Sequence, residues 1–206
     1  MEKVADFLTD YKGMGNKILE GLGEEFVNQA KEAGSVPEEV MKEFVRLLPE
    51  GKHLRGALME LSYKMCGGQD EVEILRASLA MEVLQTGFLI QDDFMDRDEL
   101  RRGLPTLHRR VADESGLQES EAIHYGYCQA VNVGDVAFFL AMGMLSDSKF
   151  ENEVKLKAIK VMSEGIVKVG FGQMMDMANS QARELKIDEV LKIHDFKTAE
   201  YTGKLP

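Results

Sequence analysis

The sequence predicts an all-α protein built from long helices. Apolar residues recur at the three- and four-residue spacing of helix faces along most of the 206 residues, without the long alternation that is typical of strands. Only 4 prolines interrupt the chain, and its 44% hydrophobic and 30% charged residues suit a helix-rich globular protein. A chain of this length can bury a real core, so we expect a single domain over residues 1–206.

Helical segments are expected wherever the apolar residues keep helical spacing, and turn or cap residues mark their ends. Ser35 suits a helix N-cap, and Gly67 suits the residue after a helix end. Gly13 and Gly15 interrupt the first segment, which predicts two helices there. In chain order, the expected helical segments are 4–33 (as two helices), 35–48, 58–66, 70–97, 118–145, 149–178 and 187–193.

Three further features shape this arrangement. Segment 70–97 is apolar nearly all round, so we expect it to be a central, buried helix. Pro105 ends the helical pattern, which predicts that residues 101–110 form a loop with a short turn after it. Near the C-terminus, Lys197 and Thr198 are expected to interrupt the last helix.

The composition limits the classes of partner. A net charge of −11, from 25 basic and 36 acidic residues, argues against a nucleic-acid binder. Cys66 and Cys128 have no metal-type spacing and are expected to be free thiols in a reducing compartment. The first residues lack the pattern of a secretory signal, and no apolar run approaches the ~20 residues of a membrane span. We therefore expect a cytoplasmic protein with no transmembrane segment.

Carboxylates gather at the end of the apolar segment 70–97. Asp92 and Asp96 are four residues apart and share one helix face, whereas Asp93 points about 100° away from that face. A helix C-terminus carries partial negative charge, so acids there have the wrong sign for simple stability. A solvated acidic helix end is the alternative, but a jointly held cation resolves the conflict better. The pattern favours a metal site at Asp92 and Asp96.

Basic residues occur in two places where an anion would offset their repulsion. Lys52 and Arg55 follow Gly51 at a helix N-terminus, which suits phosphate, although a solvated basic turn would be preferred if this stretch stood alone. The most basic stretch lies in the predicted loop, and arginine there suits bidentate phosphate binding. Its members are Arg101, Arg102, Arg109 and Arg110.

Polar and small residues inside apolar helices are further candidates. Gln85 is either a satisfied core amide or a ligand contact. Gly87 costs ~1 kcal/mol relative to alanine in a helix interior, which indicates a close backbone approach or a cavity. Gln173 and Asp176 share one helix face; a capped or solvated pair is the simpler interpretation when they are considered alone.

Five short motifs occur in order along the chain: GKHLR at 51–55, DDFMD at 92–96, RRGLPTLH at 101–108, GQMMD at 172–176 and KTAEYT at 197–202. In these motifs the chain resembles the trans-isoprenyl diphosphate synthases of the polyprenyl synthetase family. One such motif would be weak, but five in order are a specific signal. His53 departs from the arginine that is usual in the first motif.

The resemblance implies a bundle of long antiparallel helices around a central cavity and a prenyltransferase reaction. In that reaction, an allylic diphosphate (dimethylallyl, geranyl or farnesyl) ionises and alkylates isopentenyl diphosphate in a 1′-4, head-to-tail condensation that requires Mg²⁺. By resemblance, the catalytic residues are Asp92, Asp96, Arg101 and Lys197, and Asp92 and Asp96 bind the metal. The allylic diphosphate would be held by Arg101, Lys197 and Thr198 and lined by Gln173 and Asp176. Isopentenyl diphosphate would be held by Lys52, Arg55, Gln85 and Arg102.

The resemblance also implies product length and assembly. Gly87 and Phe88 precede the aspartates where aromatic residues limit product length in farnesyl-type enzymes of animals, so the glycine favours geranylgeranyl diphosphate, with farnesyl diphosphate close behind. Replacing Gly87 by phenylalanine is expected to shorten the product. Family members are usually homodimers, and helix 118–145 is a candidate interface.

One departure from the family pattern has consequences for function. The family's second aspartate-rich motif follows KTAEYT, and this sequence contains no such motif, so we expect a polyprenyl synthetase domain that lacks its C-terminal part. The alternative function is therefore a non-catalytic or regulatory homologue that binds a partner synthase. The retained basic residues oppose this alternative, because an inactive copy need not keep them.

Overall fold

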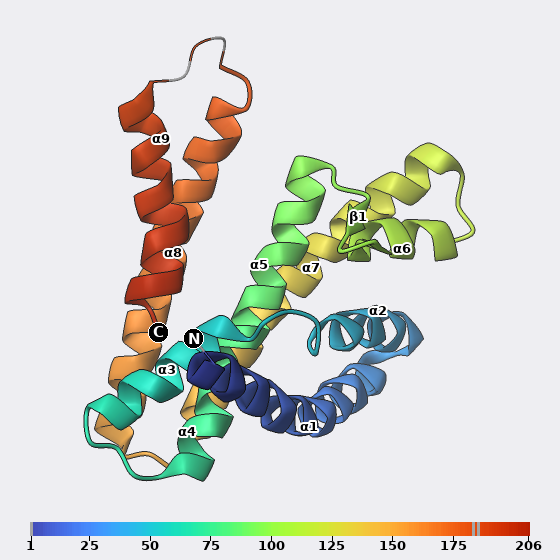
Figure 1. The fold of residues 1–206 in the computed structure, drawn as a ribbon. Coiled ribbons are helices and arrows are strands. Elements are labelled where there is room, and N and C mark those ends of the chain that lie inside the picture. Colours follow the sequence, from blue (N-terminus) through green and yellow to red (C-terminus); the bar gives the residue numbers. More distant parts are fainter. Residues whose placement is uncertain (1, 183, 185) are drawn as a thin grey trace. The chain divides into compact units, whose positions relative to one another are not determined.

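The computed structural model describes residues 2–182, 184 and 186–206 (Figure 1). In chain order the elements are α1 (Glu2–Ala33), α2 (Ser35–Leu47), α3 (Leu54–Met65), α4 (Glu71–Ser78), α5 (Ala80–Asp96), β1 (Leu100–Arg101), β2 (Leu104–Pro105), α6 (Leu107–Glu114), α7 (Glu119–Ser146), α8 (Asn152–Asn179), α9 (Ile187–Ile193) and η1 (His194–Lys204). Apart from one short hairpin, the described chain is helical, which confirms the all-α prediction.

The elements form two compact units, and the chain passes between them more than once. The first unit comprises Met1–Leu54 and Leu79–Ala141, and the second comprises Arg55–Ser78 and Met142–Pro206. Each unit is therefore built from two separate stretches of sequence. The single domain expected over residues 1–206 stays a prediction.

In the first unit, α1 packs on α2, and α5 packs on α6. Tyr11 and Leu19 of α1 are buried, as are Phe44 of α2 and Leu84 of α5. The prediction that glycines divide α1 is wrong. A Cβ at Gly15 would lie 3.0 Å from Leu79 Cδ2, so this glycine permits close packing within one continuous helix. Buried apolar contacts on both sides outweigh its low helix propensity.

The predicted helix 70–97 is two helices, because α4 ends at Ser78 and α5 begins at Ala80. The Ser78 hydroxyl donates a hydrogen bond of 2.9 Å to the Leu75 carbonyl oxygen, and such side-chain bonds bend helices. The interruption falls at Leu79, where the chain enters the first unit again. The expectation of a buried segment holds for α5, in which most residues before Gln91 are buried.

The predicted loop around Pro105 contains an antiparallel hairpin in which Leu100 pairs with Pro105. Its two turn residues, Arg102 and Gly103, have φ angles of 54° and 81°, as a type I′ turn requires. An eight-residue helix, α6, follows instead of a short turn. The hairpin turns Arg101 back toward the end of α5.

In the second unit, α8 packs along α9 and η1 (Figure 1). The predicted interruption at Lys197 and Thr198 is wrong, because the helix continues through both residues as the π-helix η1. Its wider turn is visible where the Leu205 amide donates to the Glu200 carbonyl oxygen at 2.8 Å. The expected helices 118–145 and 149–178 correspond to α7 and α8.

Helix α7 is long and apolar enough to cross a membrane, judged by length and composition alone. No segment of this kind was expected from the sequence of this helix. One third of its most apolar window is buried. Core helices of other proteins pass the same test, so the finding is weak.

Candidate functional site

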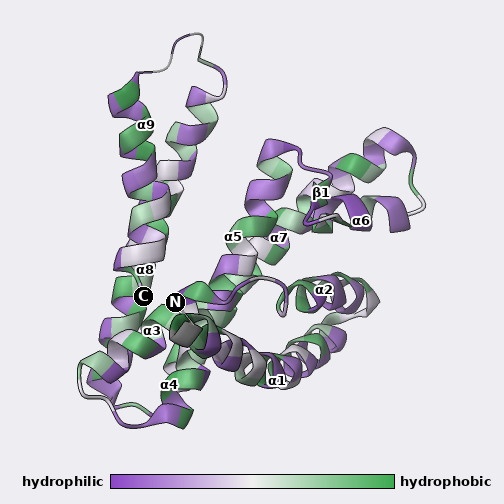
Figure 2. Ribbon diagram, in the orientation of Figure 1, coloured by the Kyte–Doolittle hydropathy of each residue, from purple (hydrophilic) through white to green (hydrophobic). Residues whose placement is uncertain are grey.

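The aspartates lie in the last turn of α5, where hydrophilic residues follow the apolar part of the helix (Figure 2). The Asp93 side chain is buried, the Asp92 side chain is 23% exposed, and Asp96 is exposed. Arg97 ends the helix in the left-handed conformation, and its amide donates to the carbonyl oxygens of Asp93 and Phe94. As the helical spacing predicts, Asp93 points to a different environment from Asp92 and Asp96.

Arg101, on the hairpin, forms an ion pair with Asp93, and its Nη2 lies 4.0 Å from Asp92 Oδ2. Burial raises the pKa of the Asp93 carboxyl, although the Arg101 guanidinium works against the rise. Burial alone would lower the pKa of Arg101, but the hydrogen bond and charge of Asp93 outweigh it and raise that pKa. The guanidinium is thus kept charged and fixed beside the two aspartates.

The carboxylates at this helix end suit only part of a metal site. Among the described residues, no group of three His, Cys, Asp or Glu side chains could hold a metal ion. Magnesium, however, often takes one or two protein carboxylates and completes its shell with water and substrate phosphate oxygens. Asp92 and Asp96 fit that role, since they are the less buried carboxylates and lie one turn apart.

A second group of cations surrounds the turn formed by Gly51, Lys52 and His53. The Lys12 ammonium donates to the Gly51 carbonyl oxygen at 2.7 Å. The Arg102 guanidinium covers Gly51, because a Cβ built there would lie 3.2 Å from Arg102 Nη1. Lys52 is exposed beside them. The turn thus brings together Lys52 and Arg102, both of which the sequence predicted to bind diphosphate, with Lys12, which it did not.

His53, the residue that departs from the family motif, is buried in this turn. Its Nε2 lies 3.1 Å from the Leu48 carbonyl oxygen, so we assign the tautomer in which Nε2 donates. Burial lowers the pKa of His53, and the nearby charges of Lys12 and Arg102 lower it further, against the hydrogen bond to Leu48. A neutral imidazole therefore replaces the arginine that the motif usually has.

Helix α5 also approaches α7 closely, as predicted at Gly87. A Cβ at Gly87 would lie 2.7 Å from Ala137 Cβ and 3.3 Å from the Gly134 carbonyl oxygen. The rings of Phe88 and Phe138 pack with their centroids 4.8 Å apart. Gln85, another predicted ligand contact, is half-buried on the same helix. The glycine therefore serves a backbone contact inside the first unit.

One hydrogen bond fixes the aspartate end of α5 to α7: Gln91 Nε2 donates to Asp135 Oδ1 at 3.1 Å. Gln91 immediately precedes Asp92, so the contact orients the turn that carries the candidate metal ligands. In the sequence, Asp135 is a polar residue within an apolar helical segment. Its partner could not be inferred, because the two residues are 44 positions apart.

In the second unit, Arg55 joins the first motif to the last. Its Nη2 donates to the Thr202 hydroxyl at 2.8 Å, and its Cζ lies 4.1 Å from the centroid of the Tyr201 ring. Arg55 Nε is buried and has no hydrogen-bond partner among the described residues. The ring and hydroxyl hold a guanidinium that retains bonding capacity for an anion.

Lys197 and Asp176, both predicted site residues, form an ion pair of 2.7 Å between η1 and α8. Gln173 is half-buried one turn earlier on α8, and Thr198 is exposed on η1. A Cβ at Gly172 would lie 2.7 Å from the Lys197 amide nitrogen, so the glycine of the GQMMD motif lets η1 approach. These predicted residues of the second unit therefore share one helix pair.

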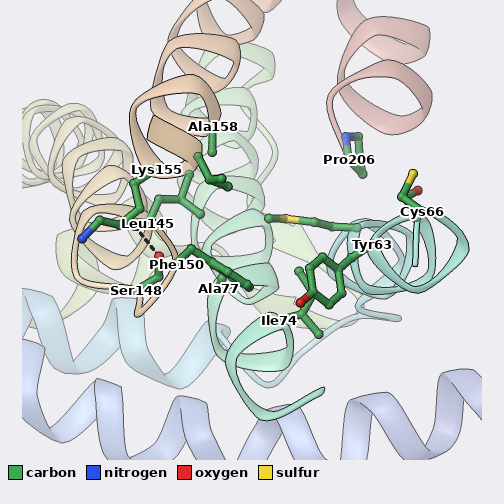
Figure 3. A pocket seen from close by; sticks show the side chains of 13 residues that line it. Tyr63, Cys66, Ile74, Ala77, Leu145, Ser148, Phe150, Lys155, Ala158 and Pro206 are labelled. Carbon is green, nitrogen blue, oxygen red and sulfur yellow. Dashed lines mark hydrogen bonds between the residues drawn. The ribbon is translucent and has the colours of Figure 1, made fainter. Parts of the chain in front are cut away.

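The second unit also contains a largely apolar pocket of about 280 Å³ (Figure 3). The rings of Tyr63 and Phe150 pack there at an interplanar angle of 57°, with centroids 5.6 Å apart. No predicted site residue belongs to its lining, which consists of Met59, Ser62, Tyr63, Cys66, Ile74, Ala77, Leu145, Ser148, Phe150, Val154, Lys155, Ala158 and Pro206. Because its lining is mostly apolar, this pocket is distinct from the clusters of charged residues described above.

Comparison with known proteins finds relatives named as prenyl diphosphate synthases. A geranylgeranyl diphosphate synthase from Sulfolobus acidocaldarius is 31% identical over 169 residues, which cover 81% of this chain and 47% of that protein. A geranylfarnesyl diphosphate synthase from Aeropyrum pernix is 32% identical over 152 residues, which cover 72% and 43% respectively. The chain spans about half the length of the curated relatives it matches.

Solved structures have the same fold. A geranylgeranyl pyrophosphate synthetase from Geoglobus acetivorans matches 96% of this chain and 57% of that chain, with a TM-score of 0.74 and 26% identity. A geranylgeranyl pyrophosphate synthase from Corynebacterium glutamicum, complexed with isoprenyl diphosphate and magnesium, matches 95% and 57%, with a TM-score of 0.85. At 23% sequence identity, this second match is evidence for the fold and not for function. The family model described as Polyprenyl synthetase matches residues 37–206, and the chain therefore belongs to the polyprenyl synthetase family.

Proposed function

We propose that the protein is a Mg²⁺-dependent trans-prenyltransferase that condenses isopentenyl diphosphate with an allylic diphosphate in a 1′-4, head-to-tail reaction. We base this proposal on the end of α5, where Arg101 is fixed beside Asp92 and Asp93. The reaction separates an allylic cation from a multiply charged leaving group, and fixed positive charge beside that group lowers the barrier. Arg101 is suited to supply such charge, because Asp93 keeps it in place.

In this proposal, the predicted site residues divide into a metal-binding pair and two diphosphate-binding sets. When bound through Asp92 and Asp96, Mg²⁺ would neutralise the leaving diphosphate. Arg101, Lys197 and Thr198 hold the allylic diphosphate, and Gln173 and Asp176 line its site. Lys52, Arg55, Gln85 and Arg102 hold isopentenyl diphosphate. No side chain need act as a strong base, since the released pyrophosphate can take the proton.

For the product, we propose geranylgeranyl diphosphate, with farnesyl diphosphate as the alternative. Gly87 and Phe88 remain the candidate length determinants. Gly87 lies against Ala137, so a larger side chain there would act by displacing α7 as well as by filling the path of the product tail. Phe88 packs on Phe138 and would bound the tail without such a displacement.

We further propose a cytoplasmic homodimer whose interface includes α7. This helix exposes Val131, Val136 and Phe139, and Phe139 is 74% exposed. Burying such side chains against a second copy would remove apolar surface from water. The same exposed residues contribute to the membrane-like composition of α7.

A non-catalytic subunit that binds a partner synthase is the second candidate. It is favoured by one observation: the described residues hold no three-ligand metal cluster. The ordered contacts of Arg55 with Tyr201 and of Lys197 with Asp176 favour the enzyme, since an inactive copy has no need of them.

The test is to incubate the purified chain with isopentenyl diphosphate, dimethylallyl or geranyl diphosphate and MgCl₂, and to separate the products by chromatography. We expect prenyl diphosphates that disappear with EDTA and fall about 100-fold or more in an Asp92→Asn, Asp96→Asn double variant. Asp98→Asn, which changes an exposed carboxylate two residues beyond Asp96, should retain activity. Absence of product from a folded chain that binds a partner synthase would favour the subunit.

A further inference from the structure

The turn at Gly51–His53 adopts an unusual backbone. Gly51 has a φ angle of 114° and His53 one of 50°, so two of three consecutive residues lie at positive φ. Glycine tolerates this conformation, and histidine adopts it at some cost, although more readily than most other residues. The contacts around the turn therefore help to hold it.

Helix α1 supplies one of those contacts. Lys12 is half-buried, and its Nζ donates to the Gly51 carbonyl oxygen at 2.7 Å across 39 residues of sequence. Gly15, one turn further along α1, also lies beside the turn, because a Cβ built there would be 3.8 Å from His53 Nδ1, an ordinary contact distance. A charge-assisted bond to a half-buried carbonyl is stronger than a neutral one.

The other side of the turn is held by the hairpin. The Arg102 guanidinium covers Gly51, and both Arg102 and Lys12 lie near enough to His53 to lower the pKa of its imidazole. Three cations, Lys12, Lys52 and Arg102, thus surround a neutral histidine in a protein of net charge −11. Their mutual repulsion is offset when an anion binds beside the turn.

We propose that Lys12 is a positioning residue for isopentenyl diphosphate, holding the Gly51 carbonyl so that Lys52 and Arg102 face the same diphosphate group. This role rests on the proposed function and extends it to a residue of the first helix. Lys12 does not itself need to touch the substrate. It acts through the turn, so its effect depends on Lys52.

The experiment titrates isopentenyl diphosphate into the full chain by calorimetry. Lys12→Met should bind about tenfold more weakly, because a charged hydrogen bond that orders the turn is lost. Lys12→Arg, which keeps a donor, should restore most of the affinity. Lys17→Met, at an exposed position of α1, is the matched control and should bind as the original chain does. Dimethylallyl diphosphate with Mg²⁺ should bind equally to the original chain and to Lys12→Met.

A double-mutant cycle distinguishes positioning from general destabilisation. In a Lys52→Met background, Lys12→Met should have a much smaller effect on the affinity for isopentenyl diphosphate. Additive effects, or unchanged affinity in Lys12→Met, would overturn the role of Lys12 and leave the proposed function intact. An original chain that binds no isopentenyl diphosphate would overturn both. Should Lys12→Met fail to fold, Lys12→Gln is compared with Lys12→Arg in the same titration, and equal affinity for these two overturns the role.

Discussion

Burial pushes the side chains of Asp93 and His53, both in the first unit, toward their neutral forms. Each contacts or adjoins the cations proposed to hold diphosphate: Asp93 pairs with Arg101, and His53 adjoins Lys52. The buried groups therefore fix geometry, while the half-buried and exposed cations provide the charge. A change to either buried residue should alter the position of its neighbours before it alters the net charge.

His53 should make stability depend on pH. Because burial lowers its pKa in the folded protein, the unfolded chain binds the proton more readily below the ordinary value near 6.5. The free energy of unfolding should therefore fall as the pH decreases through and below that value. Urea denaturation at a series of pH values should show a shallower decline for His53→Asn, since asparagine also tolerates positive φ. His124→Asn, at an exposed position, should keep the original slope.

Gly87 and Gly13 should respond oppositely to alanine, although both lie within helices. Gly87→Ala places a methyl group 2.7 Å from Ala137 Cβ and should cost about 1–3 kcal/mol of unfolding free energy by overpacking. Gly13 has no neighbouring atom within 4 Å of such a Cβ, so Gly13→Ala should stabilise by about 0.5–1 kcal/mol. Urea denaturation measures both. Equal effects would contradict the close approach of α5 and α7.

Among single residues, the sequence identified those whose role follows from their immediate neighbours in the chain. Gly87 could be identified because a glycine within a long apolar helix is costly, and Arg101 because several arginines cluster in an acidic chain. Lys12 and Gln91 could not be identified, because each acts through a partner about forty residues away. A lysine on an amphipathic helix looks the same in sequence whether it is solvated or bonded to a distant carbonyl.

At the scale of elements, long helices could be predicted and short or irregular ones could not. Strands of two residues, such as those of the hairpin, are too short to show alternation, and Arg102–Gly103 is not among the commonest type I′ turn sequences. The π-helix η1 has no sequence pattern that separates it from an α-helix with polar interruptions. At the break near Leu79, the Ser78 hydroxyl bonds the preceding turn, and the sequence does not reveal such a bond.

The packing of α8 on η1 should depend on which glycine is changed. Gly172→Ala would bring a Cβ within 2.7 Å of the Lys197 amide nitrogen, so it should displace η1 and cost about 1–3 kcal/mol. Gly170, two residues earlier, has open space at its Cβ, and Gly170→Ala should be neutral or stabilising. Thermal unfolding and amide hydrogen exchange of η1 provide the measurements. Faster exchange in Gly170→Ala than in Gly172→Ala would contradict the packing described.

For the whole molecule, the helical periodicity was sufficient to predict the all-α class, and the matched solved structures share that fold. The division into two units could not be predicted, because it depends on contacts between segments far apart in sequence. The interpretation of function depended on five short motifs. Residues of these motifs occur in both units.

Exposed apolar residues on α7 lead to a prediction about assembly. If α7 forms a homodimer interface, Phe139→Glu should shift the protein from dimer to monomer at micromolar concentration in sedimentation velocity, because it places a charge in a buried apolar contact. Met65→Glu changes a residue that is 79% exposed on α3 and serves as the control. A monomeric original chain, or a Phe139→Glu variant that remains dimeric, would argue against this interface.

The interleaved composition of the two units has a consequence for synthesis on the ribosome. Helices α3 and α4 emerge early, but their partners in the second unit come much later: Arg55 binds Thr202 across 147 residues, and Glu73 accepts a bond from the Lys149 amide across 76. At ordinary elongation rates, about 7–30 s pass between the synthesis of Arg55 and the synthesis of Thr202. Throughout that interval the apolar faces of α3 and α4 lack these partners, so the nascent chain should engage chaperones most strongly before α8 appears.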